Sequence, residues 1–249
     1  VYKRQSISYL VPAYNEEKNL KQTVAEILGL SKRLSDYEIV IVDDGSRDST
    51  NEIITTLKKN FEKIVHVRHE KNMGFGAAYR TAYMHSTKNY CMLVPADNSH
   101  PADTLIPIIM AAGEADIVIP YVINPEARSV FRQQLSRMFV NIVNYTMGLN
   151  IPYYNGLVCH RTALLQRVDT QTSGFAYQAE ILVNMIKGGA SYTTVPTNIA
   201  ERQSGASSAF KIRNITQVLG TLLHLMLRYN IRPLFLKVVG SRHEIAKRE

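Results

Sequence analysis

The chain has 249 residues, of which 45% are hydrophobic and 20% are charged, and this balance excludes a disordered chain. The length allows one large α/β domain with a full core. A net charge of +8 favours an anionic partner, either a phosphate-bearing substrate or an anionic membrane surface. Nucleic acid is not expected, because no cluster of Lys and Arg is interleaved with aromatic residues.

Strands and helices alternate through the first half of the sequence, judged from short apolar runs and from helical spacing of apolar residues. The expected strands cover residues 7–11, 38–42, 64–67, 90–94 and 116–120. The expected helices cover residues 16–34, a segment opened by a capping box at 49–52, residues 74–87 and residues 102–112. Repeated β-α units predict a parallel sheet, whose ligands bind where the strands end.

The first two strands are followed by polar motifs. Pro12-Ala13-Tyr14-Asn15-Glu16 follows the first strand and, taken alone, is typical of a turn into a helix. The second strand ends in paired carboxylates at residues 43 and 44, which suit hydrogen bonds from a base N–H and from ribose hydroxyls. The alternative is an Asp-Gly turn with a helix cap, but such a turn does not require both carboxylates.

The third and fourth strands are followed by motifs suited to phosphate and metal. Gly74 and Gly76 stand at a helix start, where backbone amides can approach a phosphate, although the spacing matches neither a dinucleotide fingerprint nor a P-loop. Asp97 follows the fourth strand and suits a divalent cation whose other ligands are phosphate oxygens and water. His100 precedes a proline and is interpreted as a turn residue.

The second half has a different pattern. It predicts a long amphipathic helix at 129–149, a short strand at 157–160, and helices at 178–187 and 211–230. Arg128, Arg132 and Ser136 are spaced by four, so they line one face of the first of these helices and suit a phosphate monoester. The alternative is a solvated polar face opposite a set of apolar residues, namely Phe131, Leu135, Met138, Phe139 and Ile142.

The helix expected at 211–230 carries an apolar stripe between basic ends. The stripe comprises Ile212, Ile215, Val218, Leu219, Leu222, Leu223, Met226 and Leu227. Lys211 and Arg213 stand at its start, and Arg228, Arg232 and Lys237 follow it. Basic ends around an apolar stripe favour a helix that lies in the headgroup region of a membrane. The alternative is a helix packed on the core or against a partner. We therefore divide the chain into a domain at 1–208 and an amphipathic, membrane-associated tail at 209–249.

The cellular compartment is inferred from cysteines and hydropathy. Cys91 and Cys159 lie in apolar stretches and are expected to be buried thiols, which suits a reducing cytoplasm. No uninterrupted run approaches the roughly 20 apolar residues that a membrane span needs. Nothing near Val1 has the pattern of a signal peptide, and a membrane segment beyond Glu249 stays open. The expected location is cytoplasmic, at the inner face of the membrane.

The order of these motifs resembles family 2 glycosyltransferases of the GT-A fold, in particular the dolichyl- and polyprenyl-phosphate mannose or glucose synthases. The resemblance runs from about Ser6 to about Ser208. The matching pieces are residues 12–16, 42–50, 72–78, 96–101, Ser136-Arg137 with Asn141, Gly174-Phe175 with Glu180, and Glu201-Arg202 with Gly205 and Ser207.

The resemblance implies a Rossmann-like, mostly parallel sheet flanked by helices, and a role for each motif. The implied donor contacts are Pro12, Tyr14, Glu16, Val42, Asp44, Ala96 and Ser99. Asp97 is the implied ligand for Mg²⁺ or Mn²⁺, and Arg202 closes over the donor phosphates. The implied acceptor contacts are Arg128, Arg132 and Ser136, while Glu180 positions the sugar or a loop.

The sequence departs from the family at two places. The usual Asp-Ala-Asp motif reads Pro95-Ala96-Asp97 here, and Ser99 stands where Gln is usual, so one carboxylate of the metal pair is missing. The arginine that commonly follows the next strand is also missing, with Pro120 and Tyr121 in that region. These departures predict weaker metal affinity, a metal held largely by the donor diphosphate, or a degenerate enzyme.

The expected reaction is an inverting transfer of a hexose from a nucleotide-sugar to a polyprenyl or dolichyl phosphate. Asp97, Arg202, Arg132 and Glu180 are the catalytic candidates. GDP-mannose and UDP-glucose both remain open as donors, as does the oligomeric state. One alternative is a soluble glycosyltransferase that acts on a saccharide hydroxyl, for which Glu180 is the best base candidate. The other is a nucleotide-sugar-binding protein that has lost catalysis.

Overall fold

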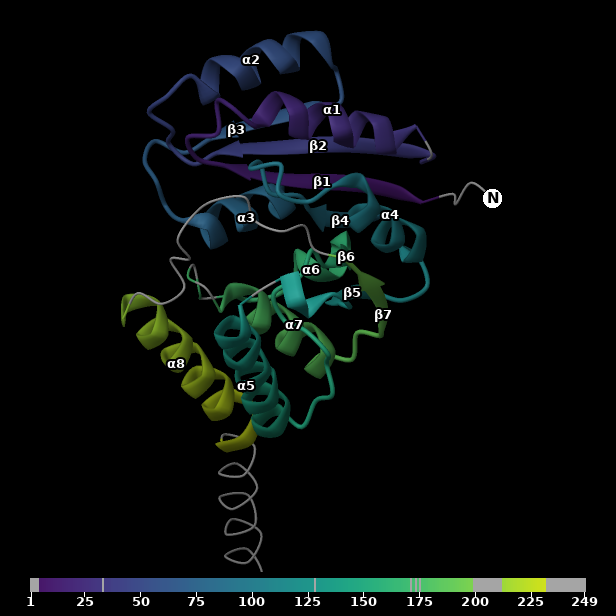
Figure 1. The fold of residues 1–249 in the computed structure, drawn as a ribbon. Helices are drawn as coiled ribbons and strands as arrows, with labels where there is room; N and C mark the ends of the chain where they lie inside the picture. The colour runs from purple at the N-terminus through teal and green to yellow at the C-terminus, as the bar shows by residue number, and fades with distance from the viewer. Residues whose placement is uncertain are drawn as a thin grey trace, which may run out of the picture.

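A computed structural model describes residues 5–32, 34–127, 129–170, 172, 174, 176–198 and 212–231. A sheet runs through the middle of the molecule with helices packed around it (Figure 1). In the described part of the chain the strands are β1 (Ser6–Ala13), β2 (Asp36–Asp43), β3 (Ile64–Arg68), β4 (Tyr90–Leu93), β5 (Ile117–Val122), β6 (Cys159–Arg161) and β7 (Tyr192–Thr197).

The strands lie in the order β3-β2-β1-β4-β6-β5-β7. β1 is parallel to both β2 and β4, β2 is parallel to β3, and β5 is parallel to β7. β6 is antiparallel to both of its neighbours, β4 and β5. Because β6 is antiparallel to each of them, β4 and β5 run in the same direction. The carboxyl ends of β1, β2, β4, β5 and β7 therefore meet at one edge of the sheet, and the predicted mostly parallel fold class is confirmed.

The helices alternate with the strands in the first half and gather below the sheet in the second half (Figure 1). They are α1 (Leu20–Ser31), α2 (Thr50–Asn60), α3 (Phe75–Met84), α4 (Ala102–Ala111), the 3-10 turn η1 (Pro125–Ala127), α5 (Val130–Met147), α6 (Thr162–Leu165), α7 (Tyr177–Lys187), α8 (Ile212–Met226) and the π-helical η3 (Leu227–Ile231). None of the helices that the structure describes is long and apolar enough to cross a membrane.

Two local expectations were wrong, and two elements were not expected. The capping box at 49–52 does not form, because the side chain of Asp48 instead accepts hydrogen bonds from the backbone N–H and the hydroxyl of Thr50. The expected helix at 16–34 begins only at Leu20, after a turn. α6 is a single turn. β7 is an edge strand with half-exposed residues and Pro196, so its sequence lacks a buried apolar run.

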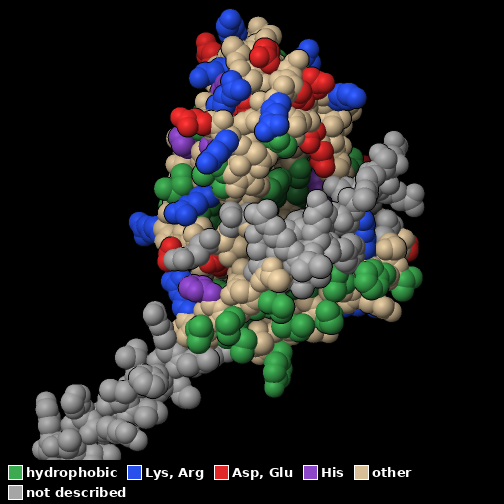
Figure 2. Space-filling view, turned by 90° about the vertical axis from the view of Figure 1, so that its left-hand side faces the viewer, with side chains coloured by type: hydrophobic (Ala, Val, Ile, Leu, Met, Phe, Trp, Pro, Cys, Tyr) green, Lys and Arg blue, Asp and Glu red, His purple; other side chains and the backbone are tan. Residues whose placement is uncertain are grey.

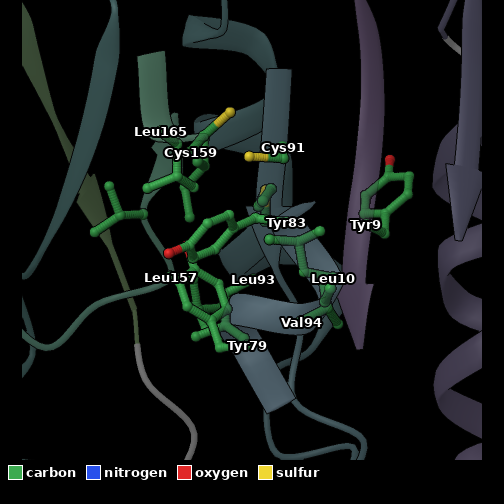
Figure 3. Packing of buried hydrophobic residues seen from close by; sticks show 14 of the residues in the cluster. Tyr9, Leu10, Tyr79, Tyr83, Cys91, Leu93, Val94, Leu157, Cys159 and Leu165 are labelled. Carbon is green, nitrogen blue, oxygen red and sulfur yellow. The ribbon is translucent and has the colours of Figure 1, made fainter. Parts of the chain in front are cut away.

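The core is continuous across the middle of the sheet. Residues 7–13 of β1 are all buried, so both faces of this strand are covered. Cys91 on β4 and Cys159 on β6 lie on neighbouring strands within apolar packing (Figure 3). Both are free thiols, as predicted, and burial raises the pKa of Cys91 to about 12. These cysteines are core residues rather than nucleophiles.

α5 and α8 lie side by side at the end of the molecule farthest from α2 (Figure 1). Asn144 anchors α5, because its side chain accepts a hydrogen bond from the backbone N–H of Ile151 and donates one to the carbonyl of the same residue. The hydroxyl of Tyr229 donates to the side-chain oxygen of Asn184 on α7 and anchors the end of α8. Both helices are thus fixed by polar contacts on their inner faces.

Candidate active site

The chain reverses its direction of travel across the sheet between β1 and β4. From β1 it moves outward to β2 and β3, and it then returns to the opposite side of β1 to form β4. In an open α/β sheet, the crevice outside the carboxyl ends of the strands at such a switch point is the usual ligand site. Tyr14 and Glu16 follow β1, and Asp97 follows β4, so these predicted residues flank the switch point.

The loops after β1 and β2 are tied together by hydrogen bonds. The backbone N–H of Asn15 donates to the hydroxyl of Ser46 at 3.0 Å, and that of Glu16 donates to the hydroxyl of Thr50 at 2.8 Å. The side chain of Asn15 in turn accepts from the backbone N–H of Arg47 at 2.9 Å. Asn15 has φ of +57°, a conformation that asparagine tolerates better than most residues. The two motifs therefore form one rigid unit.

Glu16 and Asp97 come from different strands and lie near enough to interact electrostatically. Partial burial raises the pKa of Glu16, and the negative charges of Asp97 and Asp48 raise it further against a hydrogen bond from Asn19 that lowers it. Carboxylates that repel one another in this way are a place where a cation is favoured. In the described ranges, however, no three His, Cys, Asp or Glu side chains gather closely enough to hold a metal ion by themselves.

Asp97 lies in a turn that its own side chain stabilises. One carboxylate oxygen accepts hydrogen bonds from the backbone N–H of Ser99 at 3.1 Å and from its hydroxyl at 2.6 Å. The residue between them, Asn98, has φ of +54°. The carbonyl of Ala96 accepts from the hydroxyl of Thr23 on α1 at 3.1 Å, which ties the start of the turn to α1. Ser99 thus acts here on Asp97, and its predicted contact with the donor stays a prediction.

Asp44 organises the loop after β3. Its carboxylate accepts hydrogen bonds from the backbone N–H groups of Met73 at 2.9 Å and Gly74 at 2.8 Å, and it lies 2.7 Å from Nδ1 of His69. The other ring nitrogen of His69 lies 2.9 Å from the hydroxyl of Thr81 on α3. Asp44 is buried, so this network fixes the turn that starts α3. Its predicted contact with the donor stays a prediction, and sequence reasoning missed the partner His69.

Gly45 has a steric requirement of its own. It has φ of +71°, and a Cβ atom at this position would lie 2.6 Å from the carbonyl carbon of Lys71. The loop after β2 therefore passes directly against the loop that Asp44 holds. The Asp-Gly turn, which was the alternative interpretation of this motif, is therefore present together with the paired carboxylates.

Three of the remaining predicted donor contacts differ in exposure. The side chains of Pro12 and Val42 are buried, and the two residues lie opposite each other in the β1–β2 register. Tyr14 is 39% exposed at the end of β1. Of these three residues, Tyr14 has an accessible side chain just after the carboxyl end of β1, whereas Pro12 and Val42 are buried within the sheet.

Arg132 and Ser136 lie on the inner face of α5. They share that face with the buried residues Val143 and Met147, at spacings of four, seven and four, and both are partly buried themselves. α5 begins shortly after the carboxyl end of β5, on the edge of the sheet where Asp97 lies. Both side chains keep some exposure, so the choice between an acceptor contact and a solvated polar face stays a prediction for these two residues. Arg128 lies outside the described residues.

Glu180 is fully buried on α7. Its carboxylate accepts a hydrogen bond from the backbone N–H of Thr172 at 2.9 Å. This contact fits the predicted role of positioning a loop and disfavours that of a base exposed to substrate. Arg202, the predicted clamp on the donor phosphates, lies outside the described residues.

A small cavity that sequence reasoning missed lies beside the Asp97 turn. Its volume is about 40 Å³, and its polar lining includes His100, Tyr153, Asn155 and Thr197. The side chain of Gln178 donates to the carbonyl of Gly156 and fixes the loop that carries two of these residues. The turn-forming composition of residues 152–156 is the signal in the sequence that points to this loop.

Comparison with known proteins bears on this arrangement of strand-end motifs. The profile of Glycosyl transferase family 2 matches residues 8–171. The chain belongs to this family. The undecaprenyl-phosphate 4-deoxy-4-formamido-L-arabinose transferase of Edwardsiella ictaluri is 24% identical over 229 residues, which cover 88% of this chain and 68% of the relative. The dolichyl-phosphate β-glucosyltransferase ALG5A of Trichomonas vaginalis is 35% identical over 103 residues, covering 39% of this glycosyl transferase and 32% of the relative.

Solved structures confirm the fold of this glycosyl transferase. Glucosyl-3-phosphoglycerate synthase of Mycobacterium tuberculosis in complex with UDP has a TM-score of 0.68 at 16% identity, covering 89% of this chain and 80% of that one. The same synthase has been crystallised with UDP and Mn²⁺ or Mg²⁺. At this identity the likeness shows the fold alone. The chain spans about two thirds of the length of the arabinose transferase relative and about a third of ALG5A.

Proposed function

We propose that this family 2 glycosyl transferase moves a hexose from a nucleotide-sugar to the phosphate of a polyprenyl or dolichyl lipid. The observation that carries the proposal is the inner face of α5, where Arg132 and Ser136 are partly buried near the carboxyl edge of the sheet. A guanidinium and a hydroxyl held together suit a phosphate. The relatives named for undecaprenyl-phosphate and dolichyl-phosphate support this class of acceptor.

The donor is proposed to lie across the switch point between β1 and β4. Tyr14 offers an exposed side chain for a base or ribose, and Asp44 fixes the start of α3 by accepting hydrogen bonds from the backbone N–H groups of Met73 and Gly74. UDP in a structural neighbour is consistent with a nucleotide in a fold of this kind. GDP-mannose and UDP-glucose both fit these contacts.

Asp97, with Glu16 beside it, is proposed to hold Mg²⁺ or Mn²⁺ together with the donor diphosphate. Carboxylate oxygens are the ligands that these ions prefer. Burial raises the pKa of Glu16, and the negative charges of Asp97 and Asp48 raise it further, which supports a cation at this point. Since no described trio of protein ligands gathers here, the donor diphosphate would have to supply the remaining ligands. The metal would neutralise the charge that develops on the leaving diphosphate.

The chain's own residues supply alignment rather than a strong base. A phosphate monoester is anionic near neutral pH, so its oxygen attacks the anomeric carbon without first losing a proton to the protein. The bond from that carbon to the donor diphosphate breaks as the new bond forms, which inverts the configuration. Arg132 and Ser136 orient the acceptor phosphate, and Arg202 is proposed to stabilise the departing diphosphate.

A donor-by-acceptor screen tests this proposal. The purified chain is incubated with GDP-mannose or UDP-glucose and with a polyprenyl phosphate or an oligosaccharide, with and without Mn²⁺. The expected result is metal-dependent release of nucleoside diphosphate that saturates with polyprenyl phosphate. Turnover that saturates with the oligosaccharide instead would replace the lipid acceptor by a hydroxyl acceptor. Donor binding by calorimetry without turnover under any condition would indicate a binding protein.

A further inference from the structure

A second cavity lies between α3 and α7, and we call it the α3–α7 pocket. Its volume is about 90 Å³, and its lining includes Ala77, Arg80, Tyr83, Thr172, Tyr177 and Ile181. α3 lies on the side of the molecule that faces the viewer in Figure 2, where hydrophobic side chains are visible in a hollow below the charged upper half. No step of the proposed transfer has yet used this pocket.

The two helices give the pocket apolar walls. Ala77 stands three residues before Arg80 on α3, and Tyr177 stands four residues before Ile181 on α7, so each pair shares a helix face. Aromatic contacts hold Tyr177 against α3, because its ring centroid lies 5.3 Å from that of Tyr79 and 5.8 Å from that of Phe75. The small side chain of Ala77 leaves the space open in front of these rings.

The hydroxyl groups of the pocket are already engaged within the protein. The hydroxyl of Thr172 lies 2.9 Å from that of Thr221 on α8, and its backbone N–H donates to the buried carboxylate of Glu180. The hydroxyl of Thr170, which also lines the pocket, lies 3.3 Å from that of Tyr83. These contacts fix the loop between the two helices and leave a lining that offers few polar groups to a ligand.

Arg80 brings a positive charge to the mouth of the pocket. Its Nη1 donates to the carbonyl of Thr170 at 3.1 Å, so the exposed side chain reaches from α3 to the loop. A guanidinium has five N–H groups, and this bond leaves others for an anion. Among the described lining residues there is no Asp or Glu to neutralise Arg80. The pocket therefore combines an apolar interior with a cationic rim.

Size and charge together narrow the class of ligand. An apolar cavity of about 150 Å³ binds benzene, so about 90 Å³ fits a smaller group of roughly five carbon atoms. A hexose is a poor fit, because its hydroxyl groups would lose their bonds to water without gaining partners. Inorganic phosphate would satisfy Arg80 and leave the apolar walls without a ligand. A branched five-carbon group joined to a phosphate satisfies both parts of the pocket.

The pocket is continuous with residues of the candidate active site. Gly76, which also lines it, stands two residues after Gly74, whose backbone N–H donates to Asp44. On the opposite wall Ile181 directly follows Glu180. A group bound in the pocket therefore lies next to the start of α3 and next to the loop that Glu180 holds.

We propose that the α3–α7 pocket binds the isoprene unit nearest the phosphate of the lipid acceptor, with Arg80 facing that phosphate. This inference rests on the proposed function and deepens it, because it assigns a site to the branched chain. Arg132 and Ser136 were proposed to orient the phosphate, and neither can distinguish one lipid chain from another. The pocket would make the enzyme selective for isoprenoid acceptors over straight-chain ones.

Calorimetry with two water-soluble probes tests this selectivity on the full chain. Citronellyl phosphate carries the methyl branches of an isoprenoid, and n-octyl phosphate is the unbranched chain of the same length. The branched probe should bind about fourfold more tightly, which is the contribution of one additional buried methyl group. Inorganic phosphate should bind more weakly than either. Equal affinities for the two chains would overturn the proposal.

Two variants locate the binding. Ala77→Leu fills the pocket and should weaken binding of citronellyl phosphate at least tenfold, whereas Ala25→Leu, at an exposed position on α1, should change it less than twofold. Arg80→Gln should weaken binding of citronellyl phosphate and leave that of the neutral alcohol citronellol unchanged. Lys21→Gln, which removes an exposed cation from α1, is its control. Urea unfolding identifies a variant that fails to fold, and unchanged binding in both folded variants would overturn the proposal.

Transfer assays separate this inference from the proposed function. With citronellyl phosphate as acceptor, Ala77→Leu should lower kcat/KM at least tenfold and leave the donor dissociation constant unchanged. Binding that responds to Ala77→Leu in a chain without any transfer activity would keep the pocket as an isoprenoid-phosphate site and reject the proposed function. Equal transfer to the branched and straight-chain probes, unaffected by Ala77→Leu, would reject the pocket and leave the function intact.

Discussion

α2 and α5 are both surface helices of one chain, but they expose opposite kinds of residue. α2 buries Ile54 against the sheet and exposes polar residues, among them Glu52, Lys58 and Lys59. α5 exposes aromatic and aliphatic residues and turns Arg132 inward. Water is therefore the natural neighbour of α2, whereas the outer face of α5 is suited to an apolar neighbour. The difference shows that the strand-edge half and the helical half of this glycosyl transferase are built for different surroundings.

The largest expected effect lies at the strand edge. Asp97→Asn should lower metal-dependent turnover by about 1,000-fold, because charge stabilisation of the leaving diphosphate is lost. Asp103→Asn, an exposed carboxylate on the first turn of α4, is the matched control and should retain turnover. Initial rates at saturating donor measure the effect. Full metal-dependent turnover in Asp97→Asn would remove Asp97 from the site.

The next largest effect compares the two faces of α5. Arg132→Ala should lower kcat/KM for a short-chain phosphate acceptor by about 100-fold, because a partly buried guanidinium that is proposed to bind the acceptor phosphate is lost. Arg137→Ala removes an exposed arginine from the same helix and should change this value less than twofold. The donor dissociation constant should be unchanged in both variants. Equal losses in the two variants would show that α5 attracts phosphate by general charge rather than through its inner face.

A smaller effect is expected where Asp44 holds the loop after β3. Asp44→Asn places an amide N–H opposite a backbone N–H that the carboxylate now accepts, and it should lower the free energy of unfolding by about 2 kcal/mol. Donor affinity should fall with it, since the start of α3 loosens. The exposed Glu70→Gln is the control. Urea unfolding and calorimetry measure the two quantities, and an unchanged unfolding energy would contradict the positioning role.

The smallest expected effect is on pH dependence, at a core position between the two halves. Neither ring nitrogen of His160 has a hydrogen-bond partner among the described residues, and burial lowers its pKa from 6.5 to about 3. Below pH 6.5 the imidazole of His160 binds a proton in the unfolded chain but not in the folded chain. The free energy of unfolding therefore falls as the pH drops from 6.5 towards 3.

Lowering the pH from 7 to 5.5 should therefore cost the wild type about 1 kcal/mol more than His160→Leu. His85→Gln, at an exposed position, should follow the wild type. Urea unfolding at the two pH values measures the difference. If the wild type and His160→Leu lost the same free energy of unfolding, the imidazole of the folded wild type would have to be charged or solvated.

The strand-edge half was largely predictable because its signals are local. Apolar runs fixed β1, β2, β3 and β4 to within two residues, and the polar residues after a parallel strand meet at one edge whatever the details of packing. The assignment of Asp97 to that edge followed from the same rule. Its electrostatic effect on Glu16 and the hydrogen bonds that Asp44 accepts from Met73 and Gly74 were not predictable, because these interactions join residues distant in the sequence.

The helical half was predictable as helices but not as surfaces. The spacing of Arg132 and Ser136 placed them on one face, and the spacing of Phe131 and Leu135 placed these on another. The sequence by itself thus determined the family, the strand order of the motifs and the division of α5 into two faces. Only the tertiary structure decided which face of α5 turned inward, because periodicity records which residues lie together, whereas burial depends on what the rest of the chain packs against them.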